Sequence, residues 1–422
     1  MYQLTQVGDG LRVATATMPY MASVSLGIWV GVGGRYEPAP LSGISHFIEH
    51  LLFKGTKRRN ARQISEAVEG IGGYLNAFTS EDNTCFYARA HASKVDCLFD
   101  VLTDMFRNSV LDPAEIDKER EVIKEEYTMY RDQPAQLVQE LLNEATWPGH
   151  PLGRPLTGTP KTIDALSRTD FLSYLETHYV SGSTLIAAAG CIQHTDLLQL
   201  VQSKRKSFRK GPRATFEPAH CSATQPKIVL HSKDTEQTQL TLGFRTCSRH
   251  DPRRFAIRLL NALLGESMSS RLFQSIREER GLVYSIYSAT SFWEDVGDLV
   301  ISAGLDTEKL EETIRLTTRE IEVLKNRPVG KSEWQRARDY VIGQMDLTLE
   351  STENRMMALG EQILGYGTVP DTQATKRRLA SVTPAEIRSV AREFFSADRL
   401  TCALVTPRKR LNHLGRWLAT LT

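Results

Sequence analysis

The 422-residue sequence has no long apolar run, few cysteines and almost no net charge. No stretch reaches the roughly 18 apolar residues of a membrane-spanning helix, so no membrane segment is expected. The six cysteines are scattered without CxxC pairs, which argues against a disulfide framework or a cysteine metal site. A net charge of +2 gives no overall attraction to nucleic acid or to an anionic membrane.

The N-terminal residues MYQLTQVGDG also lack the basic start and the apolar stretch of a secretory signal. Together with the unpaired thiols, this pattern predicts a cytoplasmic protein. The composition, with 41% apolar and 24% charged residues, is typical of a folded chain. Its length favours two domains of about 200 residues each.

Two stretches of the chain share the pattern of a capped helix that leads into a strand. One begins at Ser167 and the other at Thr383, 216 positions later. Asp170 and Glu386 follow these residues at the spacing of a capping box. Strand and helix patterns upstream of each stretch also match in the same order. The sequence therefore predicts an α+β fold of two similar, duplicated domains, each a mainly antiparallel sheet packed against helices.

The predicted first domain covers residues 1–203 and the second covers residues 226–422. Between them, residues 204–225 are basic, contain Gly, Pro and Ser, and lack periodicity. Such a cluster can form a nucleic-acid surface, but no aromatic platform or groove motif accompanies it. A solvated linker is the preferred interpretation, and no nucleic-acid partner is expected.

The stretch SHFIEHLL places His46, Glu49 and His50 within five residues of a predicted helix, for which Ser42 is the expected N-cap. Apolar residues occupy the opposite side of this helix: Ile44, Phe47, Ile48 and Leu51. Two imidazoles at positions i and i+4 project side by side and can both bind one zinc ion at about 2.0–2.1 Å. Glu49 faces the same volume and is a candidate base in this H-x-x-E-H signature. The alternative is a pair of partly exposed histidines beside a surface glutamate.

A second predicted helix begins near Asp112 and carries two carboxylates, Glu119 and Glu126, inside its apolar stripe. A buried carboxylate is costly unless it is paired or bound to a metal. Glu126 is therefore expected to be a metal ligand, with Glu119 as its supporting neighbour. The alternative is a solvated acidic helix, which suits Glu121 and Glu125 but explains the other two poorly.

These residues, with Glu126 placed 76 positions after His50, resemble the pitrilysin family of inverted zinc peptidases. That family includes insulin-degrading enzyme and the mitochondrial processing peptidase. The neighbouring LLFKGT, GGYLNAFTS and EREVIKEE extend the resemblance, which is closest to the small-subunit, bacterial processing-peptidase-like branch and covers essentially the whole chain. It implies a zinc metalloendopeptidase, with one zinc ion per chain, that cleaves extended or unfolded peptides. The implied ligands are His46, His50 and Glu126, with Glu49 as general base and Glu119 as a second acid that aids the site.

The resemblance also gives roles to Arg277 and Tyr284, which would bind substrate and stabilise the developing oxyanion. Larger relatives join two such halves, whereas this chain is only one half. A homodimer is therefore expected, in which Arg277 and Tyr284 of the partner subunit complete each zinc site. A heterodimer with a related subunit remains an alternative.

The segment GYLNAFTS, from Gly73, alternates like a strand after a glycine turn. The resemblance makes it an edge strand that receives an extended peptide, with Asn76, Ala77 and Phe78 as substrate-binding residues. An ordinary buried strand is the alternative. For the whole protein, the rival function is a structural or peptide-binding partner subunit without turnover, and the intact metal motif argues against it.

Overall fold

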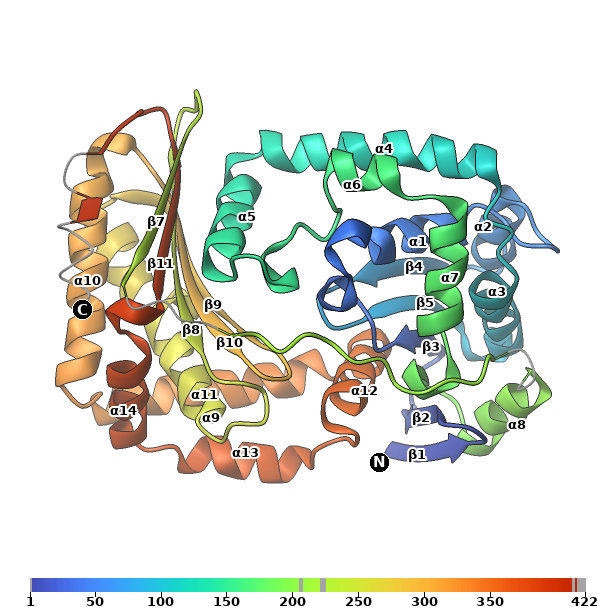
Figure 1. Cartoon of the computed structure of the whole chain (residues 1–422). Coiled ribbons are helices and arrows are strands. Elements are labelled where there is room, and N and C mark those ends of the chain that lie inside the picture. Colours follow the sequence, from blue (N-terminus) through green and yellow to red (C-terminus); the bar gives the residue numbers. More distant parts are fainter. Residues whose placement is uncertain (1, 205–207, 221–224, 412–413, 416–422) are drawn as a thin grey trace. The chain divides into compact units, whose positions relative to one another are not determined.

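The computed structural model describes residues 2–204, 208–220, 225–411 and 414–415, and the chain divides into two compact units (Figure 1). The first unit comprises Met1–Met129, Arg154–Glu217 and Leu347–Pro370, and the second comprises Tyr130–Gly153, Pro218–Asp346 and Asp371–Thr422. Each unit contains one sheet with helices on its faces. The predicted α+β fold with two similar domains is therefore confirmed.

The sheet of the first unit has the strand order β1-β2-β6-β3-β5-β4. Its β2–β6 pair is parallel and its other pairs are antiparallel. Strand β4 pairs with β5 alone and therefore forms an edge of the sheet. The strands are β1 (Tyr2–Val7), β2 (Leu11–Thr17), β3 (Ser23–Val30), β4 (Tyr74–Thr79), β5 (Thr84–His91) and β6 (Thr184–Gly190).

Helices cover both faces of this sheet because its strands alternate buried side chains toward each face. Apolar residues of α1, α3 and α7 pack against one face, and those of α12 pack against the other. The helices of this unit are α1 (Ile44–Leu52), α2 (Ala61–Glu69), α3 (Val95–Asn108), α4 (Pro113–Asp132, which runs on into the second unit), α6 (Pro160–Ala165), α7 (Arg168–His178), α8 (His194–Lys204) and α12 (Thr352–Tyr366).

Helix α12 comes from the C-terminal half of the sequence yet belongs to the first unit. The indole N–H of Trp29 in β3 donates a hydrogen bond to Met356 Sδ at 3.3 Å. Gly360 lies directly over the same indole, because a Cβ added there would be 2.0 Å from a ring atom. The fit of this helix to the sheet thus requires a glycine opposite a tryptophan.

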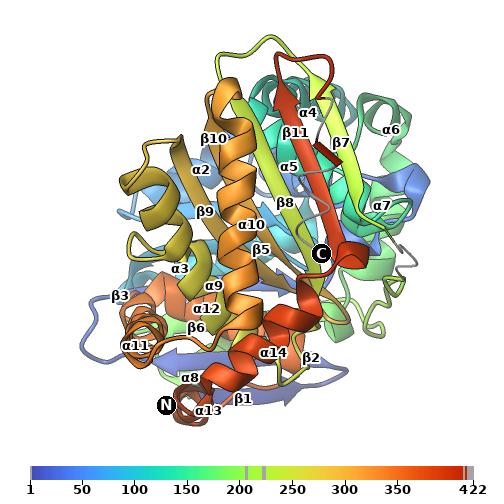
Figure 2. The ribbon, with the colours of Figure 1, turned by 90° about the vertical axis from the view of Figure 1, so that its left-hand side faces the viewer.

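The sheet of the second unit has the order β7-β11-β8-β10-β9, in which β7–β11 is the parallel pair. This order matches that of the first sheet without β1. Figure 2 shows its strands with α10 and α14 in front of them. The strands are β7 (Lys227–Ser232), β8 (Thr238–Thr246), β9 (Val283–Phe292), β10 (Gly297–Leu305) and β11 (Leu400–Thr406). The helices are α5 (Pro134–Thr146), α9 (Arg254–Asn261), α10 (Leu310–Asn326), α11 (Lys331–Thr348), α13 (Thr372–Ser381) and α14 (Pro384–Phe394).

Helix α5 makes the reciprocal exchange, since it comes from the N-terminal half and packs on the second sheet. Leu142 of α5 lies 3.1 Å from the position that a Cβ of Gly243 in β8 would take. The capping boxes predicted at Ser167 and Thr383 are both present, at the starts of α7 and α14. The predicted domains were the continuous ranges 1–203 and 226–422. The compact units differ from them because Tyr130–Gly153, with α5, belongs to the second unit and Leu347–Pro370, with α12, belongs to the first. Residues 205–207 and 221–224 of the expected linker lie outside the described residues.

Within the described parts of the chain, no helix is both long enough and apolar enough to cross a bilayer.

Candidate active site

Helix α1 carries the H-x-x-E-H motif and is fixed to the core by its apolar side. Ile44, Phe47, Ile48 and Leu51 are all buried, and the predicted orientation of the helix is therefore confirmed. The polar side of α1 faces away from this core. The helix thus presents its two histidines and its glutamate on one side.

The N-terminus of α1 differs from the prediction, because Gly43 rather than Ser42 is the N-cap. Gly43 has φ +94°, and a Cβ there would lie 2.7 Å from the carbonyl oxygen of Thr157, so a side chain does not fit. The buried carboxylate of Glu37 accepts hydrogen bonds from the backbone N–H groups of Gly43 and Ser45, at 2.7 and 2.8 Å. A distant carboxylate therefore satisfies the free N–H groups that a neighbouring serine would otherwise cap.

Burial raises the pKa of Glu37 to about 7, although its hydrogen bonds with Ser45 and Gly43 oppose this shift. A negative charge at this end of a helix is favourable, because it complements the helix dipole. Burial favours the protonated form of Glu37, whereas the two hydrogen bonds and the helix dipole favour its carboxylate. The effect of burial is the larger.

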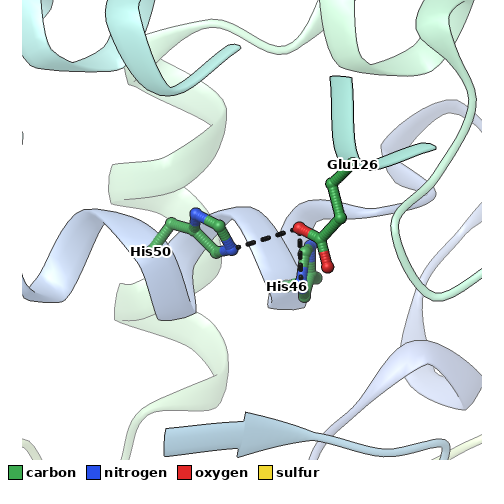
Figure 3. Close-up of side chains that lie close together, drawn as sticks. All are labelled: His46, His50 and Glu126. Atoms are coloured by element: carbon green, nitrogen blue, oxygen red, sulfur yellow. Dashed lines mark ion pairs between the residues drawn. The ribbon is translucent and has the colours of Figure 1, made fainter. Parts of the chain in front are cut away.

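Three side chains of the predicted metal site converge between α1 and α4 (Figure 3). Glu126 Oε2 lies 3.7 Å from His46 Nε2 and 3.6 Å from His50 Nε2. One ligand atom of each residue lies within 4.8 Å of the others. Ligands at about 2.0–2.2 Å from a tetrahedral zinc ion are about 3.3–3.6 Å apart. The donor set therefore suits zinc, and the two distances from Glu126 lie close to the upper end of this range.

Glu119 contacts this cluster through the ring of His50. Its Oε2 accepts a hydrogen bond from His50 Nδ1 at 3.1 Å, which leaves Nε2 of the same ring toward Glu126. Its Oε1 forms an ion pair with Lys54 Nζ at 2.6 Å. A carboxylate that holds the second nitrogen of a ligating histidine sets the orientation of the ring and raises its basicity.

His46 is suited to bind a metal because its ring is held neutral. Burial, and then the positive charge of His50, lower the pKa of His46 to about 4, against the opposing charge of Glu126. A neutral imidazole has a free lone pair, which is the form that coordinates a metal ion.

Glu49 lies on the same side of α1 and has a partner on the edge strand. The hydroxyl of Thr79, the last residue of β4, donates a hydrogen bond to Glu49 Oε2 at 2.6 Å. Burial raises the pKa of Glu49, and the Thr79 hydrogen bond and the charge of His50 partly oppose this. A carboxylate with a raised pKa, held in one orientation, is suited to accept a proton and release it again.

Asn76, Ala77 and Phe78 lie in β4, the edge strand. The Asn76 side chain is exposed, and its Oδ1 accepts the backbone N–H of Ala77 at 2.9 Å. Phe78 is half-buried, and its ring makes a T-shaped contact with the buried Trp29.

Arg277 and Tyr284 lie in the second unit, whereas the histidine and glutamate cluster lies in the first. Arg277 belongs to the π-helical segment Phe273–Glu278 and is exposed, with its guanidinium 4.8 Å from the Phe273 ring. Tyr284 lies on β9, the edge strand of the second sheet, and 76% of its surface is exposed. Both side chains are accessible to a peptide or to a partner.

Sequence reasoning did not find Glu37, Lys54 and Thr79, which support the site. For Thr79 a signal was available, because strand alternation places it on the same face of β4 as Ala77, toward α1. Glu37 and Lys54 lie in irregular segments, so no periodicity indicates the direction of their side chains.

Comparisons with known proteins show the family of this chain. The family model described as Insulinase (Peptidase family M16) matches residues 12–160, and the model described as Peptidase M16 inactive domain matches residues 165–341. The uncharacterized zinc protease YmxG of Bacillus subtilis is 34% identical over 94% of this chain and 97% of its own length. A protease from Helicobacter pylori has the same fold, with a TM-score of 0.90 at 19% identity over 96% of this chain and 100% of that chain. A chain of complex III2 from Candida albicans also shares the fold, with a TM-score of 0.85 at 17% identity over 99% of both chains. The resemblance that the motifs indicated is thereby confirmed, and the chain belongs to the M16, or insulinase, family of peptidases.

Proposed function

We propose that this protein is a zinc-dependent endopeptidase that cleaves extended or unfolded peptides. The observation that carries the proposal is the convergence of His46, His50 and Glu126 beside Glu49 on the polar side of α1. A site built only for stability would not place two imidazoles and two carboxylates together without a cation.

Each residue of the cluster has a distinct role in this proposal. His46, His50 and Glu126 would hold one zinc ion, and Glu119 would orient His50. Zinc, when bound, supplies a Lewis acid that polarises a peptide carbonyl and lowers the pKa of water. Glu49 accepts the proton of the attacking water and delivers it to the departing amine.

The edge strand β4 would hold the substrate beside this site. An extended peptide can add to an open sheet edge through backbone hydrogen bonds, which gives affinity with weak sequence preference. Asn76 and Ala77 are then the residues nearest the peptide. Phe78 holds the strand in place through its contact with Trp29. Thr79 connects the same strand to Glu49.

Substitution of Glu49 tests the reaction. Zinc-loaded Glu49→Gln protein is expected to keep its zinc and to cleave a mixed library of unfolded peptides about 100-fold more slowly or worse. Glu125→Gln is the matched control, because Glu125 is exposed on α4. Undiminished cleavage by Glu49→Gln would remove Glu49 as the base.

A non-catalytic partner subunit is the alternative. It is supported by the match of residues 165–341 to the model described as Peptidase M16 inactive domain. Wild-type protein that binds zinc but cleaves no peptide of the library would support this alternative. Glu126→Ala, compared with Glu125→Ala, tests the ligand set separately. Zinc content that is unchanged by Glu126→Ala would exclude Glu126 as a ligand.

We also propose a homodimer in which Arg277 and Tyr284 of the partner subunit complete each site. Mixing Glu49→Gln protein with Tyr284→Phe protein tests this arrangement. Composite sites would restore about a quarter of wild-type activity, because half of the dimers are mixed and each has one intact site. If both groups act within one chain, mixing restores nothing. A single-chain mass in solution would also contradict the dimer.

A further inference from the structure

A small cavity of about 50 Å³ lies in the first unit, where residues from the C-terminal end of α3 and from α7 line it. None of the candidate active-site residues lines it. Its lining includes the apolar residues Leu172 and Leu175 of α7. The polar residues Arg107, Ser109 and Arg209 also line it, and together they are called the polar wall.

Arg107 is a largely buried cation that forms no ion pair with any residue the structure describes. Its Nε is buried and makes no hydrogen bond to any described residue. Burial, and then the charge of Arg209, lower the pKa of Arg107 to about 10, and no carboxylate among the described residues offsets either effect. A buried guanidinium that is left without an anion carries a substantial free-energy cost.

The rest of the polar wall does not neutralise this charge. Arg209 forms an ion pair with Glu176 at 3.5 Å, whereas no carboxylate among the described residues pairs with Arg107. The hydroxyl of Ser109 is also buried without a hydrogen-bond partner among the described residues. Unsatisfied polar groups that line one cavity indicate a ligand with acceptor atoms.

The backbone holds this wall in place. Ser109 forms an antiparallel bridge with Thr56, and Arg209 forms a parallel bridge with Val180. Leu111, which also lines the cavity, has φ +47° and is the one non-glycine residue with positive φ among those described. Such a conformation is unfavourable for a residue with a side chain and persists where surrounding structure or function requires it. The backbone at Ser109 and Arg209 is therefore held in place before any ligand binds.

We propose that Arg107, Arg209 and Ser109 bind the carboxylate or phosphate group of a small anion, whose apolar part lies against Leu172 and Leu175. The guanidinium group presents forked N–H donors that match two oxygens of such an anion. The cavity is large enough for such a group. One water needs a cavity of about 10–15 Å³, and 50 Å³ accommodates a group the size of an oxyanion.

Binding of three probes to the full-length protein tests the proposal: inorganic phosphate, acetate and hexanoate, with sodium chloride at equal ionic strength as the reference. We expect saturable binding by calorimetry, together with a rise in Tm, for at least one of the oxyanions. Tighter binding of hexanoate than of acetate would show that the anion is a carboxylate with an apolar tail. Binding of phosphate alone would identify a phosphate group as the ligand.

Substitution at the polar wall locates the binding. Arg107→Met should weaken it about 10- to 100-fold, as expected for loss of a charged hydrogen-bonding partner. The variant should itself be at least as stable as wild type without ligand, because it removes an uncompensated charge. Arg315→Met, at an exposed arginine of α10, is the charge-matched control and should bind like wild type. Ser109→Ala should bind several-fold more weakly, and it provides a second variant if Arg107→Met does not fold.

Two outcomes would overturn the site. One is the absence of any oxyanion effect beyond that of chloride. The other is oxyanion binding that Arg107→Met and Ser109→Ala both leave unchanged.

Discussion

The stability of the first unit should depend on pH through Glu37, the carboxylate at the start of α1. Burial places its pKa at about 7 in the folded chain, against an ordinary value of 4.5. The folded state therefore binds the proton more tightly than the unfolded state does. The contribution of Glu37 to the free energy of unfolding is therefore fully present below pH 4.5. It is lost as the pH rises through 7.

The expected magnitude follows from the two pKa values. The difference corresponds to about 3 kcal/mol in total, of which about 2.5 kcal/mol is lost between about pH 5 and pH 8. Glu37→Gln removes the titration and keeps the shape of the side chain. Relative to this variant, metal-free wild-type protein should lose about 2.5 kcal/mol of unfolding free energy over that range.

Urea unfolding of both proteins across this pH range measures the effect, because other titrating groups cancel in the difference. Glu125→Gln, at an exposed position of α4, should show no such difference. Parallel pH profiles for wild type and Glu37→Gln would refute the reasoning. So would a wild-type protein that gains stability over the variant as the pH rises.

Two other substitutions test contacts on the first sheet. Thr79→Val removes the hydrogen bond to Glu49 and should lower kcat about 10- to 100-fold at unchanged zinc content; a wild-type kcat would show that the bond does not matter for the reaction. Gly360→Ala places a Cβ 2.0 Å from the ring of Trp29 and should destabilise the protein by about 1–3 kcal/mol or more in thermal unfolding. Gly343→Ala, where a Cβ meets no atom within 4 Å, should be neutral or stabilising by up to about 1 kcal/mol, and equal effects of the two substitutions would contradict the packing of α12.

Local patterns in the sequence predicted those parts of the site that repeat at helical or strand spacing. The side of α1 that carries His46 and His50 follows from its apolar stripe, and the position of Glu119 inside the stripe of α4 predicted its burial. Their convergence with Glu126 was inferred from chemistry, because a metal accounts for carboxylates and imidazoles on buried surfaces. The family resemblance then supplied the roles.

What could not be predicted depends on contacts between distant segments. An amphipathic helix must cover an apolar surface, but its pattern does not say which one. The exchange of α5 and α12 between the units was therefore not visible in the sequence. Gly360 is informative only once Trp29 is known to lie opposite it. Likewise, Glu37 caps α1 across an irregular loop, and the nearer Ser42 was the wrong choice.

The exchanged helix α12 has a consequence for how this chain is made. During synthesis, the first sheet is translated early, but the helix that covers one of its faces ends only at Tyr366. Until that residue has left the ribosome, Trp29 and its neighbours have no native cover and expose apolar surface to water. An early stop or a proteolytic cut ahead of α12 would thus leave an incomplete domain bearing the metal motif. Separation of the N-terminal half of the chain from the C-terminal half would remove a covering helix from each sheet.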